Sequence, residues 1–204
     1  MLTDNLFWHI LVAPAGRPGI DSLQIISGYA APSMVKAHLT YLAKKFPEKI
    51  TRVDLILGMT DQGIDRTEHE AYQEMSQNGV EGISFTCYYM NQGIQIHAKS
   101  YCWIADGTRA DQGFIGSANY TNAAFGKHSA QTEIMMEISA YKLANFWHRF
   151  FADATDCLQL GEQEHSEGPW SQPRQSQPRR SQPRRRQRPD PLVRYLLRSL
   201  FRGR

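Results

Sequence analysis

The chain has 204 residues, of which 41% are hydrophobic, and a formal net charge of +3 at pH 7. This length suits one domain of ordinary size with an appendage, and such a domain buries a core without needing disulfide bonds. No apolar stretch approaches the length of a membrane span, and no basic segment opens a signal peptide, so we expect a cytoplasmic protein. The cysteines, Cys87, Cys102 and Cys157, lack metal-ligand spacing and are expected to be buried thiols in a reducing compartment.

The positive charge is concentrated at the C-terminal end. Residues 169–204 contain eleven arginines and a single acid, Asp190, so the remainder of the chain is acidic overall. A Ser-Gln-Pro-Arg unit repeats there with a five-residue period, and a segment of this composition cannot bury a core. We therefore expect a folded domain over residues 1–160 and a disordered, low-complexity Arg/Pro/Ser/Gln-rich tail over 161–204, with a short basic amphipathic end at 192–201.

The first half of the domain alternates between short apolar runs and helical patterns. Pro32 suits the first position of a helix, and apolar residues recur at helical spacing from there until Pro47 ends the pattern. We expect strands over 7–13, 23–30 and 53–57, and helices over 32–46 and 65–77.

The second half is richer in strands. The sequence predicts a hairpin of strands 83–89 and 94–104 joined by an Asn-Gln-Gly turn at 91–93. Further elements are expected as strands over 113–116 and 131–139 and an amphipathic helix over 141–158. Alternation followed by a hairpin predicts an α/β fold with a mixed sheet flanked by helices.

Chemistry-bearing residues gather in this second half. His97 and Lys99 lie two apart in the expected strand, so their side chains point to the same face. The run Gly116-Ser117-Ala118-Asn119 follows, and then Glu133. A nitrogen nucleophile beside a fixed cation, facing a loop rich in hydrogen-bond donors, is what attack on a phosphodiester without a metal requires.

This order, H-x-K followed by G-S-x-N and an acidic residue, resembles the phospholipase D-like superfamily. The flanking runs, 25–30 and 117–121, are similar to the NgoFVII-type restriction endonucleases of that superfamily, and the resemblance covers about residues 5–155. It implies a phospholipase D-like single domain and a metal-independent DNA endonuclease. Because single-motif members of the superfamily act as homodimers, the resemblance also implies a homodimer that binds DNA.

The mechanism expected from these residues has two displacements. His97 attacks phosphorus to form a phosphohistidine, while Lys99, Asn119 and Ser117 hold the non-bridging oxygens. Glu133 accepts a hydrogen bond from the other ring nitrogen of His97 and so fixes its tautomer, with Glu137 as the alternative acid. A second histidine must protonate the leaving oxygen, and we expect it from a second subunit. No cofactor and no metal are expected.

One position departs from the common motif. The superfamily places an aspartate five residues after the lysine, where this chain has Ile104; Asp106 is expected to be a turn residue with Gly107. Two other features lie near the motif. Ser117 also suits the N-cap of a following helix. His128 lies on the loop beyond Asn119.

Other functions remain open on the sequence alone. A phospholipid phosphodiesterase or phosphatidyl transferase uses the same histidine, with the amphipathic end of the tail resting on a membrane. A non-catalytic, truncated fragment would instead bind nucleic acid through the tail's arginines. The tail itself is either functional or a frame-altered remnant of a DNA-recognition domain, which restriction enzymes of this type are expected to carry.

Overall fold

The computed structural model of the chain describes residues 1–60, 63–91, 93–126 and 132–160. The predicted tail over 161–204 and His128 lie outside the described residues. None of the described helices is long and apolar enough to cross a membrane.

The described residues form a seven-stranded sheet with the strand order β6-β5-β4-β1-β2-β3-β7. The strands are β1 (Ile20–Ser27), β2 (Arg52–Leu57), β3 (Ser84–Met90), β4 (Lys99–Ala105), β5 (Arg109–Gly116), β6 (Met135–Ile138) and β7 (Ala154–Asp156). β1, β2 and β3 run parallel, whereas β4, β5, β6 and β7 are antiparallel to their neighbours. The expected mixed α/β sheet is therefore confirmed.

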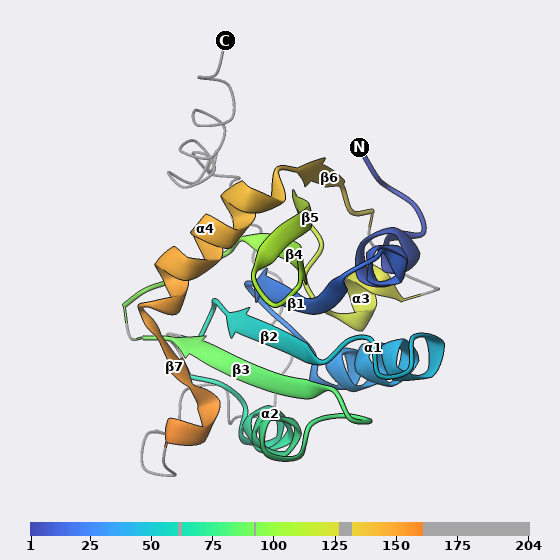
Figure 1. Cartoon of the computed structure of the whole chain (residues 1–204). Coiled ribbons are helices and arrows are strands. Elements are labelled where there is room, and N and C mark those ends of the chain that lie inside the picture. Colours follow the sequence, from blue (N-terminus) through green and yellow to red (C-terminus); the bar gives the residue numbers. More distant parts are fainter. Residues whose placement is uncertain (61–62, 92, 127–131, 161–204) are drawn as a thin grey trace, which may run out of the picture. The chain divides into compact units, whose positions relative to one another are not determined.

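Helices cover both faces of this sheet (Figure 1). α1 (Pro32–Lys45) and α2 (Arg66–Asn78) bury their apolar faces against one side, in the same cluster as alternate residues of β1 to β5. α4 (Ala140–Phe151) packs through Ala140 and Leu143 against Cys102 and Ile104 on the other side. Alternate residues of a strand point to opposite faces, which is why β4 contributes to both clusters.

The prediction of a strand over residues 7–13 is wrong. The segment is helical, as η1 (Phe7–Val12) and η2 (Ala13–Gly16). Its apolar residues are buried in the same hydrophobic cluster as α1 and α2. A side chain from β4 donates a hydrogen bond to one of its carbonyl oxygens: Trp103 Nε1 lies 2.8 Å from the Ile10 oxygen. A short apolar run is compatible with either a buried strand or a buried helix, and here the tertiary contacts decide in favour of the helix.

The predicted hairpin of strands 83–89 and 94–104 is also wrong. β3 pairs with β2 and β7, while β4 pairs with β1 and β5, so two strands separate them in the sheet. The connecting segment crosses the ends of β1 and β2: Ile96 N donates to the Gly58 oxygen at 2.9 Å, and Gly28 N donates to the Ala98 oxygen at 3.1 Å. Six parallel register pairs between β2 and β3 outweigh the local turn signal.

Several element boundaries differ from those expected. β5 is longer than predicted and β6 shorter, and α4 ends at Phe151 instead of extending to residue 158. The chain then adds β7 at the sheet edge and a short helix, η3 (Cys157–Gln159). Cys87, Cys102 and Cys157 are buried free thiols, as expected.

Buried His38 joins η1, α1 and the loop before α3 (Asn122–Phe125). Its Nε2 bonds to the Leu11 oxygen at 2.7 Å and its Nδ1 to Tyr120 Oη at 2.6 Å. Burial lowers the pKa of His38 to about 4, against the usual 6.5. Below pH 6.5 the unfolded chain therefore binds the proton more readily than the folded one, so this histidine makes folding less stable as the pH falls towards 4.

We expect this histidine to account for about 2 kcal/mol of the stability lost between pH 7 and pH 5. Urea unfolding of the wild-type chain and of His38→Gln at both pH values measures the difference. The variant is destabilised at pH 7 but loses less on acidification. Exposed His9→Gln is the control and keeps the wild-type pH dependence. Equal pH dependence in wild type and His38→Gln would refute the assignment.

Candidate active site

The predicted site residues come together at one end of the sheet. β1 and β5 end there, and β4 and β6 begin there, with Ser27 opposite Lys99 and Gly116 opposite Met135. Because neighbouring strands are antiparallel, the start of one strand lies beside the end of the next. Residues far apart in the sequence are therefore brought to one edge.

Lys99 is the first residue of β4, and it is buried. The residue is 5% exposed, and its Nζ donates to the carbonyl oxygen of His97 at 2.8 Å. Burial lowers the pKa of Lys99 to about 8, and the nearby carboxylate of Glu133 partly opposes this shift. The cation is thus fixed beside the backbone of the expected nucleophile.

His97 lies just before β4 and is exposed, so the predicted strand 94–104 begins later than expected. Two glycines let its segment approach the sheet. A Cβ at Gly28 would lie 2.8 Å from His97 Cδ2, and one at Gly58 would lie 2.0 Å from the Ile96 oxygen. The ring of Tyr29 meets the imidazole edge to face, with 5.9 Å between the ring centroids.

Ser117 and Glu133 form a pair beside Lys99. Ser117 Oγ donates to Glu133 Oε2 and accepts from Ile134 N at 2.9 Å, while Ser117 N donates to the Ile134 oxygen at 3.0 Å. Ser117 is not the N-cap of a helix, because α3 begins only at Asn122 with Thr121 as its N-cap. The serine instead fixes the carboxylate at the start of β6.

Asn119 is held by the end of β1. Its Oδ1 accepts from Tyr29 N at 3.2 Å and lies 3.5 Å from Ser27 Oγ. Because the amide oxygen is used in this way, the Nδ2 group is the end of the side chain that can donate to an anionic oxygen. The geometry suits a donor to phosphate.

Two residues that the sequence did not single out hold this loop. Buried Ser27 donates to the Tyr29 oxygen and accepts from Tyr120 N at 2.9 Å. Buried Tyr101 donates through Oη to the Ala118 oxygen at 2.8 Å. The contacts of Ser27 with Tyr120 and of Tyr101 with Ala118 join residues distant in sequence, so no local spacing could reveal them.

Removing the Ser27 hydroxyl is expected to lower phosphodiester cleavage by about 10-fold to 100-fold, because the loop that carries Asn119 loses its anchor to β1. Cleavage kinetics of Ser27→Ala measure the effect. Ser22→Ala, on the same strand, is the control and should stay close to wild type. Wild-type kinetics in Ser27→Ala would show that the hydroxyl does not position the loop.

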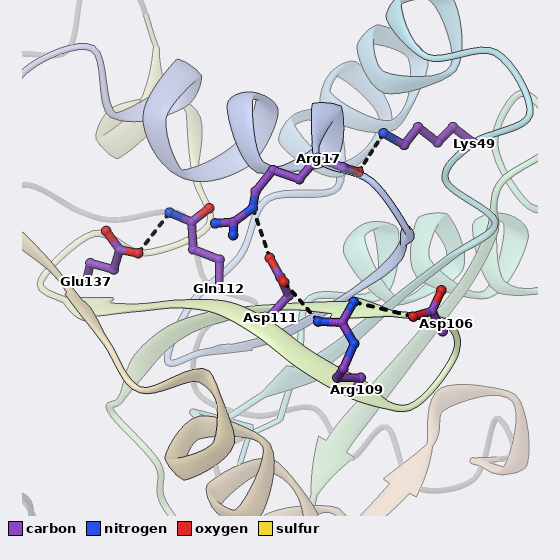
Figure 2. Close-up of polar contacts among 7 residues, drawn as sticks. All are labelled: Arg17, Lys49, Asp106, Arg109, Asp111, Gln112 and Glu137. Atoms are coloured by element: carbon purple, nitrogen blue, oxygen red, sulfur yellow. Dashed lines mark hydrogen bonds and ion pairs between the residues drawn. The ribbon is translucent and has the colours of Figure 1, made fainter.

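Glu137 and Asp106 lie among other partners (Figure 2). Glu137 accepts from Gln112 Nε2 at 3.0 Å, and Asp106 pairs with Arg109 at 3.3 Å. Asp106 has a positive φ of 53° and precedes Gly107, as expected for a turn residue. Ile104, at the position where the superfamily has an aspartate, is buried against α4. Of the two candidate acids, Glu133 bonds to Ser117 and lies near Lys99, whereas Glu137 bonds to Gln112.

No predicted residue lines the cavity of about 240 Å³ between α4 and the sheet, whose walls include Gln24, Arg52, Asp54 and Trp147. Within the described ranges, no group of three or more His, Cys, Asp or Glu side chains is arranged to hold a metal ion.

A mixed sheet with the H-x-K pair and the G-S-x-N loop at one end defines a phospholipase D-like domain. The family model of the NgoFVII restriction endonuclease N-terminal PLD domain matches residues 4–164. The chain therefore belongs to this family, whose members are nucleases of the phospholipase D type.

One solved structure that resembles this chain is the polyphosphate kinase from Porphyromonas gingivalis. It shares 16% sequence identity with a TM-score of 0.46, and the match covers 70% of this chain and 23% of the kinase. The comparison with curated protein sequences gives no match.

Proposed function

We propose that this protein is a metal-independent phosphodiesterase that cleaves DNA as a homodimer through a phosphohistidine intermediate. The observation that carries the proposal is the meeting of His97, buried Lys99, Asn119 and the Ser117–Glu133 pair at one end of the sheet. Family membership supports DNA as the substrate, since the matching family is one of restriction endonucleases.

In the first step, a ring nitrogen of His97 attacks phosphorus. The P–N bond forms as the P–O bond to the leaving nucleotide breaks, and the leaving oxygen takes a proton from a second histidine. Negative charge grows on the non-bridging oxygens, where Lys99 and Asn119 can supply a cation and an N–H donor. Glu133, fixed by Ser117, is the candidate to orient the imidazole of His97 and stabilise its positive form.

In the second step, water attacks the phosphohistidine. The second histidine, now neutral, takes a proton from the water, and the P–N bond breaks to release a phosphomonoester and neutral His97. Because the chain has one H-x-K motif, we assign the second histidine to His97 of a second copy. The same residue of two copies can meet only at a two-fold axis, so the proposal places His97 of both copies at the axis of the dimer.

The proposal is tested by incubating supercoiled plasmid with the purified protein and excess chelator, together with a sizing measurement. Cleavage that persists in chelator, by a protein of twice the chain mass, is the expected result. Hydrolysis of phospholipid vesicles without DNA cleavage would assign the phospholipid alternative. DNA binding without cleavage at any salt concentration would assign the non-catalytic one.

The charge of Lys99 gives the proposal a pH signature. Its role requires the protonated amine, and its pKa is lowered to about 8 by burial. We expect kcat/KM to fall as the pH rises through about 8, well below the usual pKa of lysine. In Lys99→Arg the part of the alkaline fall that is due to this lysine should disappear, because arginine stays charged throughout the range. Any fall that remains in this variant belongs to the second histidine, which must be protonated to act as the acid.

Rates from pH 6 to pH 10 with the wild-type chain, Lys99→Arg and the exposed control Lys142→Arg measure this behaviour. The control should keep the wild-type profile. An alkaline fall at the same pH in Lys99→Arg would assign the titration to another group.

A further inference from the structure

Tyr29 exposes a large aromatic ring at the edge of the catalytic site. It follows Gly28 directly after β1, and 51% of its surface is exposed. Its edge-to-face contact with the imidazole of His97 places it beside the attacking group, with 5.9 Å between the centroids and 77° between the planes.

The backbone of Tyr29 is fixed independently of its side chain. Its N–H donates to Asn119 Oδ1 at 3.2 Å, and its carbonyl oxygen accepts from Ser27 Oγ. The backbone is therefore held at a defined place by hydrogen bonds that any residue other than proline could make at this position. The tyrosine side chain itself is not needed to anchor the loop.

We propose that Tyr29 is a stacking site for the nucleobase next to the scissile phosphate. This inference rests on the proposed function. A phosphate attacked by His97 is joined to its base through one sugar, so that base lies within reach of a ring that contacts the imidazole. Every base presents a flat face, and stacking of a base on an aromatic side chain contributes about 1–3 kcal/mol without sequence preference.

A stacking site at Tyr29 also sets a requirement on the form of the DNA. In a regular duplex both faces of a base are covered by its neighbours, so the base must unstack before it can reach Tyr29. Single-stranded DNA meets this requirement at the least cost. We therefore expect cleavage of a duplex to require local opening of the helix at the scissile phosphate.

The test compares two substrates that share a backbone: an oligothymidylate and an oligomer of the same length made of abasic deoxyribose phosphates. The wild-type chain should bind the oligothymidylate about 10-fold more tightly. Tyr29→Ala should lose this preference, and Tyr29→Phe should keep it. Tyr141→Ala, which removes a ring with 70% exposure on α4, is the matched control and should also keep it.

Binding is measured in the His97→Ala background as well as in the catalytic chain, so the outcome does not depend on cleavage. An equal loss of binding to both oligomers in Tyr29→Ala would overturn the proposal, because a positioning role acts on both. A halved particle mass in Tyr29→Ala would overturn it in favour of a subunit contact. If the preference is present without cleavage, the stacking site stands and the proposed function fails.

Discussion

Replacing His97 by alanine is expected to reduce DNA cleavage by about 10⁵-fold or more, to the background rate. In the proposed mechanism this residue supplies both the nucleophile and, from the partner subunit, the proton of the leaving group. The variant should fold normally, because the side chain it loses is exposed. Plasmid cleavage in chelator measures the rate, and urea unfolding measures stability.

His9→Ala is the matched control, since His9 is also exposed but lies on η1. Its cleavage rate should equal that of the wild type. Mixing sharpens the test: after wild-type and His97→Ala subunits exchange in equal amounts, about a quarter of the dimers retain two histidines. Activity near a quarter, and not near a half, is expected if each site needs both copies. Substantial activity of His97→Ala alone would contradict the assignment.

The second large effect is expected at Gly58. The segment before His97 crosses this residue so closely that an added Cβ would lie 2.0 Å from the Ile96 oxygen and 2.9 Å from its carbonyl carbon. The obstructing atoms are backbone and cannot rotate away. We expect Gly58→Ala to lower the free energy of unfolding by about 2–4 kcal/mol and cleavage by at least about 100-fold, because the shifted segment carries the nucleophile.

Gly16→Ala provides the comparison. A Cβ there would meet the ring of Phe46 at 3.6 Å, which is an ordinary contact, so stability and cleavage should change little. Urea unfolding and cleavage rates of both variants check the prediction. Near-wild-type cleavage by Gly58→Ala would mean that the segment before His97 does not need its close approach to β2.

The residues of the candidate site could be identified from the sequence because they lie in short motifs. His97 with Lys99, and Ser117 with Asn119, are close in sequence, and their residue types suggest phosphate chemistry before any fold is known. The pairing of Ser117 with Glu133 and the anchoring of Asn119 by Ser27 were not predictable. They depend on which strands become neighbours, and that is decided by long-range pairing.

The sheet shows why this pairing escaped prediction. A turn signal at 91–93 between two apolar runs is typical of a hairpin, so the local sequence predicts that 83–89 pairs with 94–104. In the structure β3 prefers parallel pairing with β2, so the chain crosses two strand ends before β4 begins. The crossing segment carries His97 to the site. In the sequence, the crossing is marked only by Gly28 and Gly58, where a larger residue would clash with that segment.

The central claim, covalent attack by His97, is tested most directly by the stereochemistry at phosphorus. A DNA phosphorothioate of known configuration is cleaved in ¹⁸O-labelled water, and the configuration of the product is determined. Each in-line displacement inverts phosphorus, so attack by His97 followed by water predicts net retention. Net inversion would mean that water attacks the phosphodiester directly, and it would contradict the account.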